Sequence, residues 1–173
     1  MKFFISLSFL LLFAFNPINS NEIKIVYVDT DKILNESNVG KNIKKQVDVI
    51  NNKNISNFKK IEEKLKAEEK KISQQKNIIS KEEFEKKFNV LRINANKFNK
   101  DVNDSKKDLV LKKNIATKKL LDSLTPILSE YASKNSIHII LQKSLIIIGR
   151  EDLDITDSIL TIVNKRVKNI KLN

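Results

Sequence analysis

The sequence has 173 residues and a formal net charge of +12, with 33 lysine and arginine residues against 21 aspartate and glutamate residues. It contains no cysteine, which excludes disulfide bonds and thiol chemistry, so its stability must come from packing or from oligomerisation. Two glycines and two prolines are too few for an all-β fold with many tight turns, and they favour long uninterrupted helices.

Residues 1–20 have the pattern of a secretory signal peptide. Lys2 gives a positive start, an almost unbroken apolar run covers residues 3–15, and Pro17 interrupts it before the small residue Ser20. The apolar run is shorter than the roughly 20 residues that cross a bilayer as a helix. We therefore expect export and cleavage near Ser20, with an uncleaved N-terminal anchor as the alternative.

The mature chain opens with elements that are short. The β-branched run at residues 23–28 predicts a strand that ends at Asp29. Residues 31–35 fit a short helical turn. Ser37 or Asn38 then provides the N-cap of a following helix, since both side chains accept hydrogen bonds from the free amides of a first turn.

A long helical segment fills the middle of the chain. No glycine or proline occurs from residue 41 to residue 124, which is longer than a normal globular helix. Ser80 and Glu83 form a capping-box pattern near the midpoint. We therefore predict a helical hairpin arm at residues 41–122 that reverses near residues 76–80. One very long helix, paired along its length with another chain, is the alternative.

Two heptad seams support the hairpin, because apolar residues recur at alternating spacings of three and four. The seam of the second half comprises Phe84, Phe88, Leu91, Ala95, Phe98, Val102, Ser105, Leu109, Lys112 and Ala116. The seam of the first half is looser and includes polar residues. It comprises Val47, Asn54, Phe58, Ile61, Leu65, Glu68, Ile72, Gln75 and Ile79.

The C-terminal part predicts a bend, two strands and a helix. Pro126 predicts a bend near Thr125, followed by about two further helical turns. Residues 137–141 and 145–148 are rich in isoleucine and leucine, and the short polar link between them predicts a β-hairpin. Residues 154–157 provide the N-cap signal of a last amphipathic helix.

The predicted fold class is α+β and mostly α, in the order β-α-α-β-β-α. A small α/β body, residues 21–40 and 123–173, carries the long antiparallel coiled-coil arm. The arm holds 23 basic and 12 acidic residues, whereas the rest of the mature chain holds nine of each. The whole excess of positive charge therefore lies on the arm.

The chain is not expected to be an enzyme. His138 is the only histidine and lies in an apolar strand pattern, so a structural role is expected for it. One histidine without cysteine does not make a zinc site, and the sequence has no glycine-rich phosphate loop. We therefore predict no catalytic residue, no metal site and no cofactor.

Two stretches of the sequence are similar to the Skp family of periplasmic chaperones, also called OmpH-like proteins. The opening pattern runs from a strand through a short helix to a glycine-lysine pair, and the closing pattern runs through the apolar strands into an acidic-apolar-Thr-Asp step. These stretches are residues 25–29, 32–37 and 40–41, then 137–141, 145–148 and 153–160. The resemblance covers essentially the whole mature chain.

The resemblance implies a periplasmic homotrimer that holds unfolded outer-membrane proteins without ATP. The bodies would join through their strands and the arms would surround a cavity. The residues expected at the joints are Ile23, Ile25, Tyr27, Ile139, Leu141, Ile146 and Ile148. The alternative is that these strands form only the core of a monomer. This arm is richer in asparagine and lysine than the family pattern, so its flexibility and client range are expected to differ.

Clients are expected to meet leftover apolar side chains within a basic surface. The apolar candidates are Phe58, Ile78, Phe88 and Ile93, and the basic candidates are Lys70, Lys71, Lys76, Lys81, Lys86, Lys87 and Arg92. Anionic lipid and lipopolysaccharide are further candidate partners, since a basic surface attracts anions over long range. A structural coiled-coil adaptor and a basic lipid- or nucleic-acid-binding protein are the alternatives. Specific nucleic-acid binding is not expected, because no groove-reading motif is present.

Overall fold

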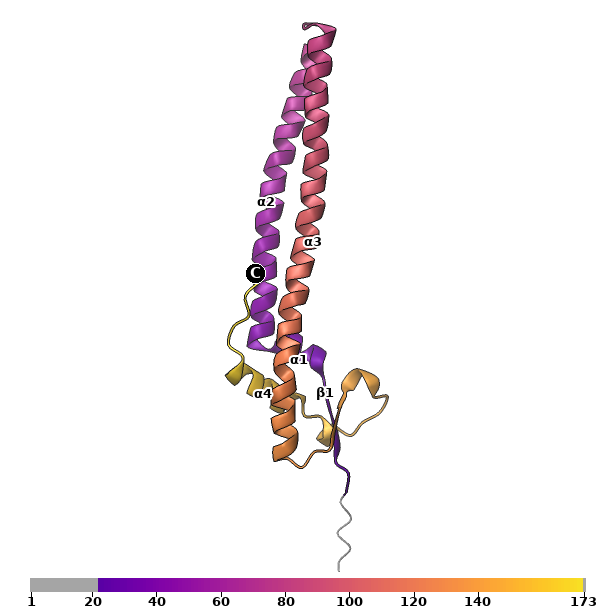
Figure 1. Cartoon of the computed structure of the whole chain (residues 1–173), viewed down its shortest axis with the longest axis vertical. Coiled ribbons are helices and arrows are strands. Elements are labelled where there is room, and N and C mark those ends of the chain that lie inside the picture. The colour runs from indigo at the N-terminus through magenta and orange to yellow at the C-terminus, as the bar shows by residue number, and fades with distance from the viewer. Residues whose placement is uncertain (1–21, 173) are drawn as a thin grey trace, which may run out of the picture.

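The computed structural model describes residues 22–172, so the predicted signal peptide lies outside the described residues. It shows a small body from which a long two-helix arm projects (Figure 1). The elements in chain order are β1 (Ile25–Val28), α1 (Thr30–Glu36), α2 (Asn38–Gln75), α3 (Lys81–Lys134), β2 (Ile139–Gln142) and α4 (Thr156–Arg166). Two short 3-10 turns, Lys143–Leu145 and Glu151–Leu153, precede α4.

The reversal at the tip of the arm lies over residues 76–80, between the end of α2 and the start of α3. The Ser80 side chain accepts a hydrogen bond from the Glu83 amide at 3.2 Å, so the predicted cap is formed. The one glycine of the two helices, Gly40, lies in the first turn of α2, so no glycine interrupts the arm beyond its base. Within residues 22–172, no helix is long and apolar enough to cross a membrane.

The sheet of the body has two strands, and they are parallel. Ile25 pairs with Ile139 and Val28 pairs with Gln142, so the whole arm is the connection between β1 and β2. Parallel neighbours require such a long crossover, because a tight turn joins only antiparallel strands. An isolated bridge from Tyr27 to Asp154 occupies the other edge of β1.

The predicted β-hairpin of residues 137–148 is wrong in its second half. Within the described residues, 145–148 form no strand; the link before them is wound into the 3-10 turn Lys143–Leu145, where the Ile146 amide donates to the Lys143 carbonyl at 3.0 Å. Residues 145–148 would have to pair with β2, and the 3-10 turn takes the place of the tight reversal that such antiparallel pairing needs. The run therefore forms a loop that carries Ile147 99 % exposed and Ile148 91 % exposed.

The core of the body gathers residues from every element. The fully buried side chains Ile33, Leu120 and Ile159 come from α1, α3 and α4. They meet Val26 and Val28, the inward-facing residues of β1. Because the base of α3 enters this cluster, the arm is anchored in the hydrophobic core rather than attached by a flexible linker.

Helix α3 continues through Pro126 to Lys134 as one element. The sequence predicted a bend near Thr125, since proline removes one backbone hydrogen bond. Leu124 and Ile127, on either side of the proline, are buried in the core. Their burial keeps this part of the chain helical, and the arm and the body share one continuous helix.

The C-terminal tail after α4 lies back along the base of the arm. Gln46 on α2 donates to the Ile170 carbonyl at 2.9 Å and accepts from the Leu172 amide at 3.1 Å, as a strand neighbour would. Glu130 on α3 bonds Arg166 of α4 and Lys134, and these hydrogen bonds lower the pKa of Glu130 to about 2. Helix α4 and the tail therefore fasten both arm helices to the body.

Candidate functional site

The interior of the arm is thinly packed. Between Lys44 and Ile115, Ile72 and Leu91 are the buried side chains, whereas most other seam residues are half-buried. Phe58 on α2 and Phe98 on α3 meet edge to face, with ring centroids 6.0 Å apart. Such a seam holds the two helices together but leaves part of their apolar surface exposed.

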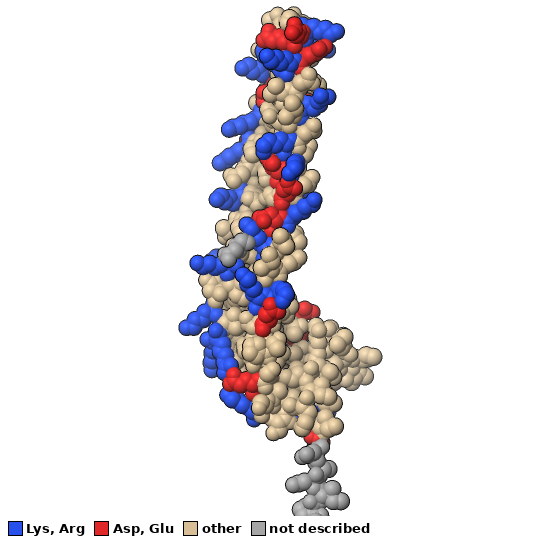
Figure 2. Space-filling model, in the orientation of Figure 1, with Lys and Arg blue, Asp and Glu red and all other residues tan. Residues whose placement is uncertain are grey.

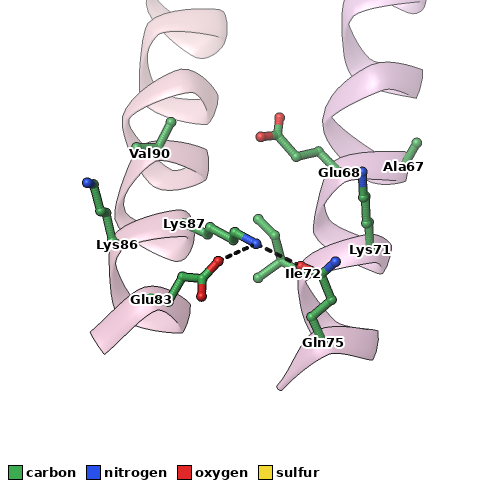
Figure 3. A pocket seen from close by; sticks show the side chains of 9 residues that line it. All are labelled: Ala67, Glu68, Lys71, Ile72, Gln75, Glu83, Lys86, Lys87 and Val90. Atoms are coloured by element: carbon green, nitrogen blue, oxygen red, sulfur yellow. Dashed lines mark hydrogen bonds and ion pairs between the residues drawn. The ribbon is translucent and has the colours of Figure 1, made fainter. Parts of the chain in front are cut away.

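Polar pairs interrupt the seam at two levels. Midway along the arm, the Asn54 side chain donates to the Ser105 hydroxyl at 2.8 Å. Near the tip, the Lys87 ammonium bonds the Gln75 amide oxygen at 3.1 Å and pairs with Glu83 at 3.0 Å (Figure 3). These bonds satisfy polar groups that would otherwise be costly to enclose, and they fix the register of the two helices.

The predicted seam is confirmed along most of α3 and is wrong near the tip. Phe88 was expected inside, but its side chain is 49 % exposed and stacks on Phe84. Lys87 turns inward instead, because α2 presents Gln75 at this level and the amide oxygen accepts its ammonium. On α2, Ile61 and Glu68 are exposed at the edges of the seam.

The four apolar candidates for client contact do not form one patch. Phe58 is half-buried in the seam, and Ile78 is 80 % exposed in the turn at the tip. Phe88 and Ile93 are exposed on the first turns of α3. An unfolded chain would meet them as separate contact points along the outer half of the arm.

The seven basic candidates surround the tip. They lie on the last turns of α2, in the reversal and on the first turns of α3. Lys87 is half-buried and the other six are exposed. Figure 2 shows lysine and arginine side chains along the whole length of the arm, whereas the lower right of the body is almost uncharged in that view. The charged surface is therefore continuous well beyond the tip.

A groove beside the tip brings three of these lysines together with apolar side chains. Lys71, Lys86 and Lys87 line it with Ile72 and Val90 (Figure 3). Its open volume is about 740 Å³. Lys87 is already engaged by Glu83 and Gln75. In the described part of the chain no group of three histidine, cysteine or acidic side chains is placed to hold a metal ion.

Most of the residues expected at joints between copies lie on the surface of the body. Ile23, Ile25, Ile139, Leu141 and Ile148 are exposed, and Ile146 is half-buried. Tyr27 differs from the expectation, because its ring is buried within its own body and its hydroxyl donates to the Arg150 carbonyl at 3.0 Å. Its side chain is therefore not available to another copy in this conformation.

A profile of the family described as outer membrane protein (OmpH-like) matches residues 24–163. The chain belongs to the OmpH-like family. A solved structure of a candidate OmpH-like outer membrane chaperone from Caulobacter crescentus CB15 has the same fold, with a TM-score of 0.82 at 16 % sequence identity. The similarity covers 87 % of this chain and 89 % of that chain. No curated protein sequence matches.

The OmpH-like match confirms the predicted family and the predicted fold class, in which a helical arm rises from a small body with a short sheet. The profile ends within α4, so the tail that Gln46 binds lies outside the matched region. A second groove is lined by residues beside the seam at the middle of the arm, such as Ile55 and Asn99, which the heptad pattern did not identify as site residues. The sequence feature that could have identified them is that they lie next to heptad positions.

Proposed function

We propose that this chain is an ATP-independent holdase chaperone of the periplasm that binds unfolded outer-membrane proteins and prevents their aggregation. The observation that carries the proposal is the arm of this OmpH-like chain, which exposes apolar side chains such as Ile78, Phe88 and Ile93 within a lysine-rich surface. The Caulobacter crescentus protein is described as a candidate outer membrane chaperone, and that description agrees with this function.

The proposed mechanism is weak contact at many points. Apolar contacts are non-directional, so they suit a client without fixed structure. The lysines attract acidic client segments over distances near the Debye length, which is about 8 Å at physiological salt. Release requires only that the client reach a more stable folded state in the membrane. The same lysines suit anionic lipid headgroups and lipopolysaccharide.

The exposed side chains argue against a purely structural adaptor. A coiled coil that acts only as a spacer buries its apolar residues in the seam and exposes charged residues on its outer surface. Here Phe88, Ile93 and Val110 remain exposed on α3. The thin seam and these exposed residues favour a surface that binds other chains.

To test the holdase function, an outer-membrane β-barrel protein is diluted from urea without ATP, and its aggregation is followed by light scattering. We expect the purified mature chain to suppress scattering at a near-equimolar ratio of assembly to client, and high salt to weaken the effect because it screens the lysines. Scattering that stays unchanged at every ratio would overturn the holdase proposal and leave a structural coiled coil as the better account.

We further propose that the working form is a homotrimer joined through the bodies. The supporting features are the exposed residues Ile147 and Ile148 in the loop that follows β2, and the exposed strand residues Ile25 and Ile139. An exposed apolar loop and an open strand edge are hazards for a monomer, and association with another copy removes them.

Ile148→Asp is expected to convert the trimer to monomers, because a carboxylate without a partner is costly to enclose in an apolar joint. The measurement is the mass in solution by sedimentation at several protein concentrations. Ile93→Asp is the matched control, since it makes the same chemical change at an exposed arm position. Equal masses for the Ile148→Asp variant and the wild type would contradict the proposed joint.

A further inference from the structure

One side of the arm, at its middle, carries a groove with an apolar floor. Ile55 and Phe58 of α2 and Phe98 and Val102 of α3 line it, and its open volume is about 610 Å³. The groove continues toward the body as far as Leu109 through a second hollow, which shares Ile55, Phe58 and Val102 with the first. The floor exists because the thin seam leaves one side of the Phe58 and Phe98 rings uncovered.

Asparagines line the wall of this groove. Asn99 and Asn103 stand one turn apart on α3, so their amides point the same way about 6 Å from each other. Within residues 22–172 neither side chain makes a hydrogen bond to another residue, unlike Asn54, which is held by Ser105. Asparagine is a poor helix former, so helix stability does not explain the pair.

The groove is electropositive. Lys59 and Lys106 line it and form no ion pair in the described part of the chain. Its one acidic residue, Glu62, is already paired with Lys66 at 2.6 Å, and this hydrogen bond lowers the pKa of Glu62. Two lysines are therefore left to attract a carboxylate from outside.

We propose that this groove binds an extended, apolar segment of an unfolded client that is flanked by acidic residues. The apolar side chains would lie on the Phe58 and Phe98 floor, and the client backbone would bond the amides of Asn99 and Asn103. An extended chain presents like-facing backbone groups about every 6.7 Å, close to the spacing of these two amides. A docked helix would leave the asparagines unused, because its backbone groups bond internally.

The inference rests on the proposed holdase function and specifies what the arm recognises. The first probe is a fluorescein-labelled peptide of about ten residues with alternating valine and threonine and glutamates at both ends; a second has lysines in place of the glutamates. Fluorescence anisotropy with the full mature chain measures both affinities. We expect the acidic peptide to bind more tightly, in a salt-dependent way.

The first variant is N99A/N103A, whose helix is maintained because alanine is the stronger helix former. We expect about tenfold weaker binding of the acidic peptide, the effect of losing two or so neutral hydrogen bonds. The matched control is N89A/N96A, which changes two exposed asparagines of α3 outside the groove and should bind like the wild type. Circular dichroism verifies that both variants remain helical.

The second variant is K59Q/K106Q, and its control is K60Q/K107Q, which removes the same charge from the neighbouring positions of the same helices. We expect the groove variant to lose the preference for the acidic peptide and the control to keep it. Equal losses in variant and control would overturn the groove, because only the overall field of the arm would then matter.

The two proposals fail in different ways. A wild-type chain that suppresses client aggregation, with N99A/N103A suppressing equally and binding the peptide equally, would overturn the groove and leave the holdase function standing. A wild-type chain that binds no peptide would also overturn the proposed groove. This is the result expected if another copy of the chain occupied the groove. A wild-type chain that suppresses no aggregation would overturn the holdase function itself.

Discussion

Gly40→Ala is expected to lower the free energy of unfolding of the body by about 3 kcal/mol or more. This loss is larger than the one expected for a substitution at an exposed position. A methyl group at Gly40 would overlap the carbonyl oxygen of Leu34 and lie 2.8 Å from its carbonyl carbon. The obstacle is backbone in the last turn of α1, so no side-chain rotation relieves it. Only a separation of α1 from α2 makes room, and that opens the core around Ile33 and Val39.

The measurement is the urea concentration at half-unfolding, followed by circular dichroism at one fixed protein concentration. Lys41→Ala is the matched control, because Lys41 is exposed in the same first turn of α2. We expect the control to change the free energy of unfolding by no more than about 0.5 kcal/mol. A Gly40→Ala chain as stable as the wild type would mean that α1 does not pack against α2 as described.

The arm was predictable because its signals are local. The heptad spacing from Leu91 to Ala116 and the cap at Ser80 depend only on residues near one another in sequence. The departure at Phe88 shows the limit of this reasoning. Lys87 and Phe88 flank the same seam, and the choice between them depends on Gln75, which the reversal places opposite.

The body was harder to predict because its pairing is long-range. Residues 137–141 and 145–148 have similar composition, yet only the first run finds a strand to pair with, more than 100 residues away in sequence. Periodicity does not separate a paired apolar run from an exposed one. The binding of the Ile170 and Leu172 backbone by Gln46 had no sequence signal either, because a glutamine side chain is common on any helix surface.

The candidate site was predicted in part. The basic character of the tip followed from composition, whereas the groove at the middle of the arm did not. Asn99 and Asn103 resemble ordinary solvent-facing residues until the register of α2 against α3 places them beside the Phe58 and Phe98 rings. That register depends on both helices, so it was not visible in either helix alone.

Leu120→Ala is expected to lower the free energy of unfolding by about 2–5 kcal/mol, the usual cost of a large-to-small change in a closed core. Leu120 is 0 % exposed and lies where the base of α3 enters the body. The Leu120 side chain helps to fix the arm to the body, so its loss destabilises both the body and the base of the arm. For a chain of this size we expect the melting temperature to fall by roughly 4–20 °C.

Leu111→Ala makes the same chemical change on α3 at a position further from the body, where the side chain is 57 % exposed. It should leave the melting temperature almost unchanged, because little apolar surface is lost from the interior. Equal losses for the two variants would mean that α3 is stabilised evenly along its length. The expected inequality would instead place the stability of the arm at its base, and a thin seam further out would then remain free to adapt its surface to clients.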